Sequence, residues 1–161
     1  MTDKPDFEKL LQVLASNKVE MVVIGGVAMS LRASDYVTLD LDICFKRTPE
    51  NVERLCRALA PYCSTIRSAF LEMQDFMMNI SRGEKFVTDY GDIDLLGEVS
   101  GLGDYSAVLS LSSPIDLGGT IVQTLTLNGL IKAKEAANRP KDQAHLITLR
   151  ALKQMEDEEN S

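Results

Sequence analysis

The sequence predicts a single α+β domain in which helices pack against a small mixed β-sheet. Some segments repeat apolar residues every three or four positions, as amphipathic helices do, and others are short apolar runs or alternations typical of strands. The two kinds of segment follow each other without a regular rhythm, which favours a mixed sheet over a fully parallel one. The length of 161 residues fits one domain. We expect residues 1–155 to form this domain and residues 156–161 to be an acidic tail in solvent.

Two helices and two strands are expected at the start of the chain. Asp6 can cap a helix over residues 7–16, whose apolar residues recur at helical spacing. Residues 21–24 are all apolar and predict a strand covered on both faces. A short helix over residues 27–31 follows, and residues 38–43 alternate between apolar and polar side chains, which predicts a strand with one exposed face.

One helix and three short strands are expected in the middle of the chain. Pro49 is typical of a first helical position, and apolar residues at helical spacing follow it. Residues 81–84 have the composition of a hairpin turn between the first two of the three strands. The predicted strands cover residues 76–80, 85–88 and 93–96.

The last third of the chain is expected to be mostly helical. A short helix beyond residue 104 and a strand over residues 121–125 precede two helices, over residues 127–137 and 140–154. Pro140 separates these two helices because proline fits a first helical turn and cannot continue the preceding helix.

Composition excludes several classes of protein. There are 24 acidic and 17 basic side chains, a net charge of −7, which argues against coating nucleic acid through a broad basic surface. No apolar run reaches the ~18 residues of a membrane span, and the N-terminus is too polar for a signal peptide, so we expect a cytoplasmic protein without a membrane partner. The cysteines, Cys44, Cys56 and Cys63, lack the pairing of a zinc site and are expected to be reduced, packed thiols.

Two carboxylates alternate on the strand predicted at residues 38–43. Asp40 and Asp42 are two positions apart, so both project from the same strand face. Such like charges repel each other, and a divalent cation that prefers oxygen ligands turns the pair into a binding site. They could also be the solvent face of an edge strand, but aspartate is disfavoured in strands. The pair therefore favours a metal site, with Mg²⁺ as the natural ion.

A second acidic pair has the same spacing on a later strand. Asp92 and Asp94 alternate with apolar residues just as Asp40 and Asp42 do. This strand could pair beside the first one, and one of its carboxylates could then complete the metal site.

The residues at 25 and 26 and the last two helices supply features that bind phosphate. Gly25-Gly26 stands between a strand and a helix, where glycine lets backbone N–H groups approach an anion and the helix dipole favours it. Alone, the pair is more often a tight turn. Lys134, Arg139 and Lys141 add positive charge suited to a triphosphate. With two Mg²⁺ ions, these features describe phosphoryl or nucleotidyl transfer.

These residues resemble the nucleotidyltransferase fold superfamily related to DNA polymerase β. Its pattern is an apolar strand, Gly-Gly or Gly-Ser, a gap of roughly a dozen residues, and Asp-apolar-Asp or Asp-apolar-Glu. Here thirteen residues separate Gly25-Gly26 from Asp40-Leu41-Asp42. The chain looks most like small stand-alone members similar to AbiEii-type toxins and minimal antibiotic nucleotidyltransferases. In these relatives a lysine followed by Arg-x-Lys-Asp recurs near the C-terminal helices. The residues here that match this pattern are Lys134, Arg139, Lys141 and Asp142.

The resemblance implies a Mg²⁺-dependent enzyme that moves a nucleoside monophosphate from an NTP, such as ATP, to an acceptor hydroxyl. It implies that Asp40, Asp42 and Asp94 are catalytic and hold metal, with Asp92 as the alternative third carboxylate. The implied nucleotide-binding residues are Gly25, Gly26, Lys134, Arg139, Lys141 and Asp142.

Several alternatives stay open from the sequence. The acceptor could be RNA, a protein or a small molecule, and a second copy of the chain could complete its pocket. A module of the same fold that has lost turnover and regulates a partner, such as a toxin–antitoxin component, is the competing function. Three retained acids argue against it. Lys134 and Asp142 could also serve only to complement helix dipoles.

Overall fold

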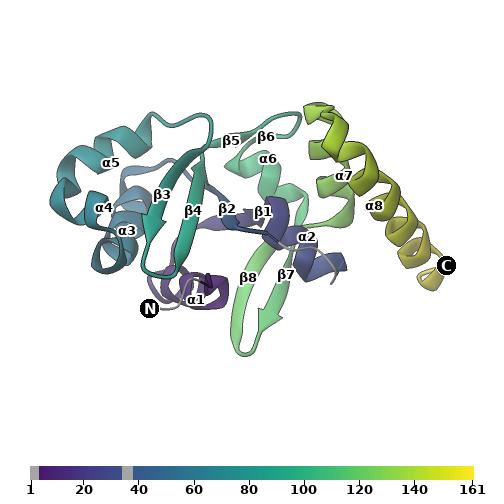
Figure 1. Cartoon of the computed structure of the whole chain (residues 1–161), viewed down its shortest axis with the longest axis horizontal. Coiled ribbons are helices and arrows are strands. Elements are labelled where there is room, and N and C mark those ends of the chain that lie inside the picture. Colours follow the sequence, from purple (N-terminus) through teal and green to yellow (C-terminus); the bar gives the residue numbers. More distant parts are fainter. Residues whose placement is uncertain (1–3, 34–37) are drawn as a thin grey trace.

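The structure is a computed structural model that describes residues 4–33 and 38–161, and it has the predicted α+β architecture. A six-stranded mixed sheet runs in the order β3-β4-β2-β1-β8-β7, and β5 and β6 form a separate two-stranded ribbon (Figure 1). The strands are β1 (Met21–Ile24), β2 (Asp40–Phe45), β3 (Glu84–Thr88), β4 (Gly91–Leu96), β5 (Glu98–Val99), β6 (Gly103–Asp104), β7 (Ser112–Leu117) and β8 (Thr120–Leu125).

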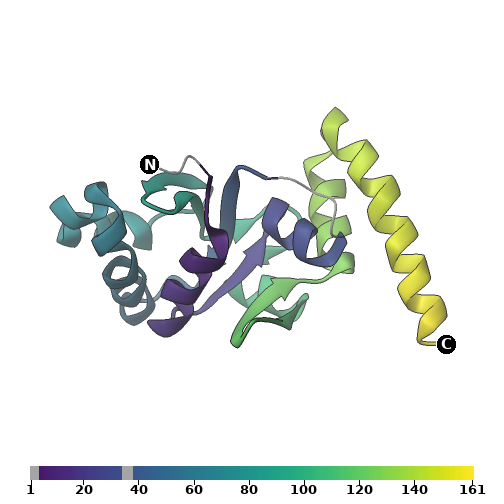
Figure 2. The same ribbon diagram turned by 60° about the horizontal axis from the view of Figure 1, so that its bottom comes forward.

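Helices lie at both ends of the sheet. Figure 1 shows α3, α4 and α5 grouped beyond β3, and α7 and α8 at the opposite end of the molecule, an arrangement that Figure 2 repeats from another side. The helices are α1 (Phe7–Ser16), α2 (Gly25–Ala33), α3 (Pro49–Leu59), α4 (Ser64–Ser68), α5 (Phe70–Met78), α6 (Tyr105–Ser110), α7 (Leu127–Ala137) and α8 (Pro140–Glu159), with a 3-10 turn at Ala60–Tyr62.

Both parallel and antiparallel pairs occur in the main sheet. β1 pairs with β2 antiparallel and with β8 parallel, while β2 pairs with β4 parallel. The hairpins β3–β4 and β7–β8 are antiparallel. The central strands β1 and β2 therefore have neighbours on both sides, which keeps their backbone groups paired inside the fold.

The core lies around the two central strands. All four residues of β1 are buried, as its uninterrupted apolar run predicts. β2 buries Leu41 and Ile43 while Asp40 and Asp42 stay partly exposed, which is the alternation of a strand covered on one face. On α1, Leu10, Leu11 and Leu14 are fully buried, in agreement with its helical spacing.

The strand predicted at residues 76–80 is wrong, because most of this segment is the end of helix α5. Its apolar run was too short to distinguish a strand from a buried helix turn. Met77 is fully buried and its Sδ lies 3.4 Å from Cys56 Sγ on α3, so packing between the helices decides the conformation. The prediction of a hairpin turn at residues 81–84 is also wrong, because the observed hairpin joins β3 to β4.

Other elements differ in extent or were not predicted. Strand β7 was not predicted, and it contains Pro114, which is tolerated because β7 is an edge strand. The short ribbon of β5 and β6 was also not predicted. α8 continues to Glu159, so the acids at 156–159 lie on its exposed final turn. Residues 1–3, at the start of the polar N-terminus, and residues 34–37, within the gap before Asp40, lie outside the described residues.

All three cysteines are free and buried, as expected of packed thiols. Within residues 4–33 and 38–161, no helix has both the length and the hydropathy that a bilayer span requires.

Candidate active site

Four aspartates share one face of the sheet where β2 and β4 run side by side. The parallel register pairs Asp40 with Asp92 and Asp42 with Asp94. Partners in register project from the same face, and alternate residues of one strand do so too. The expectation that the second acidic strand lies beside the first is therefore confirmed. All four side chains are partly exposed, so a ligand can reach this carboxylate face.

Ionisation of the aspartates on the carboxylate face is disfavoured by burial and by their mutual repulsion. Burial, and after it the neighbouring charges of Asp94 and Asp40, raise the pKa of Asp42 to about 7, against the opposing effect of Lys85. Burial also raises the pKa of Asp94, against the opposing effect of Lys85. Positive charge brought to this face would therefore favour the ionised carboxylates.

One cation of the chain already contacts this face. Lys85, on β3, places its Nζ 3.1 Å from Asp40 Oδ2. This residue was not among the predicted site residues, because nothing in the sequence shows which strand lies next to the acidic pair. The alternation of buried and exposed residues in β3, in which Phe86 is buried and Lys85 exposed, was the available signal.

Gly25 lies directly against the second aspartate of the Asp-Leu-Asp motif. Its φ of +63° is in the left-handed region, and a Cβ at this position would overlap Asp42 Oδ2. The junction between β1 and α2 can approach Asp42 only because residue 25 is glycine. The helix α2 begins at Gly25 and includes Gly26, so its N-terminus is next to the carboxylate face.

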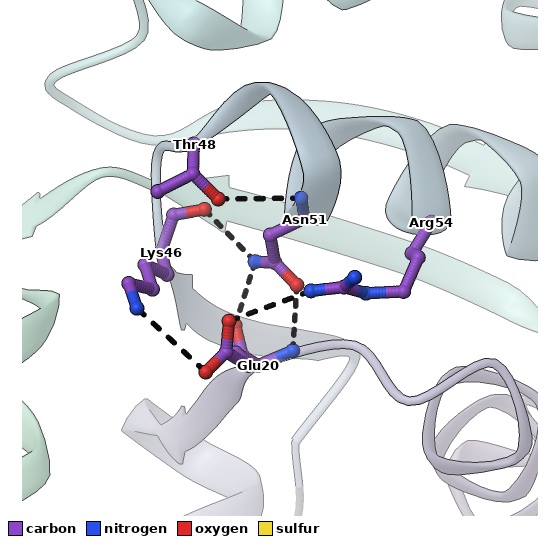
Figure 3. Close-up of polar contacts among 5 residues, drawn as sticks. All are labelled: Glu20, Lys46, Thr48, Asn51 and Arg54. Atoms are coloured by element: carbon purple, nitrogen blue, oxygen red, sulfur yellow. Dashed lines mark hydrogen bonds and ion pairs between the residues drawn. The ribbon is translucent and has the colours of Figure 1, made fainter.

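A polar network at the other end of the β1–β2 pair fixes their register (Figure 3). Asn51, fully buried on α3, accepts from the backbone N–H of Glu20 at 2.7 Å. Its amide donates to the backbone carbonyls of Glu20 at 3.0 Å and Lys46 at 2.8 Å. These two residues flank the β1–β2 ladder, which pairs Ile24 with Asp42 at its far end. The network thereby helps to hold Gly25 beside Asp42.

The corner between α7 and α8 is built around a buried carboxylate. Asp142 is fully buried and accepts from Lys134 Nζ at 3.3 Å and from Arg139 Nε at 2.8 Å. It also accepts from the Arg139 backbone N–H at 3.1 Å, which caps the start of α8. The Arg139 hydrogen bonds hold the pKa of Asp142 well below its usual range. Asp142 is thus placed to orient the two cations.

The fold brings this corner to the glycine turn. A pocket of about 310 Å³ is lined by Gly25, Lys134 and Arg139. Its remaining walls are mainly apolar and come from Leu96, Val99, Leu125 and Leu130, together with Ile24, Ser100, Ala133 and Ala137. Lys141 is exposed and is not one of these lining residues. Of the predicted nucleotide-binding residues, then, Gly25, Lys134 and Arg139 share one pocket.

The donor chemistry of the carboxylate face fits Mg²⁺. Asp40, Asp42 and Asp94 offer hard oxygen ligands from neighbouring strand positions. Among the described residues, no group of three or more histidine, cysteine or acidic side chains is already arranged around a common metal position. The carboxylates must therefore reorient their side chains to share an ion, which partly exposed side chains can do.

Comparisons with known proteins agree with this architecture. No family model matches the sequence, and no curated protein matches it. A solved structure from Thermotoga maritima, provisionally assigned as a nucleotidyltransferase, aligns with a TM-score of 0.52 at 12% identity, covering 94% of this chain and 91% of that one. The structure of ANT(2")-Ia in complex with adenylyl-2"-tobramycin aligns with a TM-score of 0.50 at 14% identity, covering 91% and 84%. The chain therefore has the nucleotidyltransferase fold.

Proposed function

We propose that the protein is a Mg²⁺-dependent nucleotidyltransferase that transfers a nucleoside monophosphate from an NTP to an acceptor hydroxyl. The observation that carries this proposal is the placement of Asp40, Asp42 and Asp94 on one sheet face, with Gly25 against Asp42. A phosphate-binding turn next to a set of carboxylates suits a metal-bound triphosphate. The nucleotidyltransferase fold supports the same reaction class.

The carboxylates would have different roles in the reaction. Asp40 and Asp42 would hold Mg²⁺, which supplies Lewis-acid stabilisation of the phosphoryl oxygens when bound. Asp94 would be the third ligand or accept the proton of the attacking hydroxyl. The hydroxyl oxygen forms a bond to the α-phosphorus, the bond from that phosphorus to the β-phosphate oxygen breaks, and pyrophosphate leaves. Asp92, which is in register with Asp40 and stands two residues before Asp94, is the alternative to Asp94.

The pocket beside Gly25 would hold the nucleotide. Backbone N–H groups at the N-terminus of α2 would face the phosphates, and Lys134 and Arg139 would add positive charge from the lining of the same pocket. Asp142 would act through these two cations, because its own oxygens already accept hydrogen bonds from them. Its contribution to nucleotide binding is therefore to position Lys134 and Arg139.

The acceptor is proposed only as a hydroxyl compound. ANT(2")-Ia is bound to adenylyl-2"-tobramycin in its structure, so a small molecule is one class to test on this chain, beside RNA and protein hydroxyls. The closer resemblance to AbiEii-type toxins stays a prediction from the sequence, as does a regulatory partner.

Calorimetric titration of Mg²⁺ with each of the four NTPs tests the nucleotide site without the acceptor. The wild-type chain should bind at least one NTP in a Mg²⁺-dependent manner. Asp42→Asn should weaken binding by about tenfold or more, since loss of a metal ligand costs at least as much as loss of an outer-shell partner. Asp75→Asn, an exposed aspartate on α5, is the matched control and should bind like the wild type. Absence of NTP binding by the folded wild-type chain would refute the proposal.

A further inference from the structure

The Lys85 side chain reaches across a strand to the carboxylate face. Lys85 on β3 is in register with Asp94 on β4, and Asp94 is in register with Asp42 on β2. Adjacent strands are about 4.8 Å apart, so β3 and β2 are separated by roughly 10 Å. Lys85 Nζ nevertheless lies 3.1 Å from Asp40 Oδ2. The lysine stem therefore passes over β4, and its ammonium lies above the sheet among the aspartates.

A single surface ion pair does not account for this reach. Lys85 and Asp40 are both partly exposed, with side-chain exposures of 50% and 32%, and an isolated pair of that kind contributes little. Ordering a long lysine side chain also has an entropic cost. The face, however, carries four carboxylates, and Asp92 and Asp94 also act on the ammonium. Their combined field attracts a cation to the place where Lys85 ends.

A divalent cation bound by Asp40 must compete with this ammonium. Lysine has three donors and no acceptor, so it cannot join the coordination of a metal ion. A metal ion and an ammonium on the same carboxylate repel each other. An ammonium that stays on Asp40 therefore weakens binding of a metal ion there. A triphosphate bound beside the metal brings negative oxygens, to which an ammonium binds as a compact point charge.

We propose that Lys85 is a built-in counter-ion, which offsets part of the negative charge of the carboxylate face while no metal is bound and moves to the phosphates of the substrate when a metal–nucleotide complex binds. This inference rests on the proposed function, since it requires a metal at Asp40. Lys85 thus disfavours binding of the free metal ion and favours binding of the metal together with its nucleotide. Lys85 acts as a positioning residue that couples the two binding events.

Binding of Mn²⁺ without nucleotide, followed by electron paramagnetic resonance, tests the first half of the inference. A unit positive charge about 5 Å from a divalent ion in water-like surroundings repels that ion and lowers its binding affinity roughly tenfold. Lys85→Met should therefore bind Mn²⁺ about tenfold more tightly than the wild type. Lys85→Arg keeps the charge and should stay close to the wild type. Arg57→Met, which removes one exposed cation paired with Glu53 on α3, is the matched control for net charge and should change nothing.

Titration of the Mg²⁺–NTP complex into the same variants tests the second half. Lys85→Met should bind the complex more weakly than the wild type, although it binds the free metal ion more tightly. A merely structural role would weaken both. Lys85→Gln provides a second neutral variant if Lys85→Met does not fold, as judged by far-UV circular dichroism.

The outcomes separate this inference from the proposed function. Equal Mn²⁺ affinity of Lys85→Met and the wild type, with binding lost in Asp42→Asn, would overturn the counter-ion inference and leave the metal site intact. No Mn²⁺ binding by any variant would overturn the metal site itself and the inference with it. Tighter Mn²⁺ binding without weaker binding of the Mg²⁺–NTP complex would overturn the move of Lys85 to the phosphates.

Discussion

Replacing Asn51 with leucine is expected to lower the free energy of unfolding by about 3–5 kcal/mol. The side chain is fully buried and makes three hydrogen bonds to the backbone of Glu20 and Lys46. The bonds to the two carbonyls contribute about 1 kcal/mol net each. Both carbonyls keep a backbone partner, the Lys46 N–H at 3.2 Å for Glu20 and the Thr48 N–H at 3.1 Å for Lys46. The Glu20 N–H would lose its acceptor beside the buried side chain, and an unsatisfied buried group costs about 1–3 kcal/mol.

Equilibrium unfolding in urea, followed by far-UV circular dichroism, measures this loss. Asn79→Leu is the matched control, because Asn79 is exposed and its amide donates to one local carbonyl, that of Asp75. Its effect should stay within about 1 kcal/mol. If Asn51→Leu is no more damaging than Asn79→Leu, the buried amide does not hold the β1–β2 register and the reasoning fails.

A second variant at the same position adds a pH signature. Asn51→Asp keeps an acceptor for the Glu20 N–H but faces two carbonyl oxygens with a carboxylate. Burial beside two carbonyl oxygens, with the Glu20 N–H as donor, raises the folded-state pKa of the new carboxyl above the unfolded value of about 4. The destabilisation caused by ionisation is therefore absent below that pH and grows as the pH rises toward the folded-state pKa. A destabilisation that does not change with pH would contradict this account.

Two further predictions concern the site. Gly25→Ala and Gly118→Ala place alanine at nearly the same positive φ, +63° and +62°. Each variant should therefore lose on the order of 1 kcal/mol of stability. Only Gly25→Ala displaces Asp42, so only this variant should also lose Mg²⁺-dependent NTP binding in calorimetry. Equal NTP affinity in the two variants would show that the close approach to Asp42 is not needed. Asp142→Asn should lower stability by on the order of 2 kcal/mol at pH 7. Because the pKa of Asp142 is lowered in the folded state, its stabilisation is full above the unfolded value of about 3.9 and is lost as the pH falls. Urea unfolding between pH 2 and 7, chosen to span roughly that range, should thus show a weaker acid dependence in Asp142→Asn than in the wild type.

The acidic motifs were predictable because strand geometry is local. Alternation fixes which side chains of a strand share a face, so Asp40 and Asp42 could be placed together from their spacing alone. The same held for Asp92 and Asp94. Helix starts were also readable, as at Pro49, where Thr48 accepts from the Asn51 backbone N–H.

Segments whose conformation depends on packing were not predictable in the same way. Residues 76–78 are apolar enough for either a strand or a helix, and the contact of Met77 with α3 selects the helix. β7 has serines and a proline, which resemble a loop, and its strand conformation depends on pairing with β8.

The sequence by itself determined the types of residue at the site and the faces on which they lie, because these follow from backbone periodicity and side-chain chemistry. Only the tertiary structure decided that β4 pairs with β2, that Lys134 and Arg139 line a pocket with Gly25, and that Lys85 reaches Asp40. These contacts join residues far apart in the chain. Strand order and helix packing set them, and both depend on how the whole core buries its apolar surface.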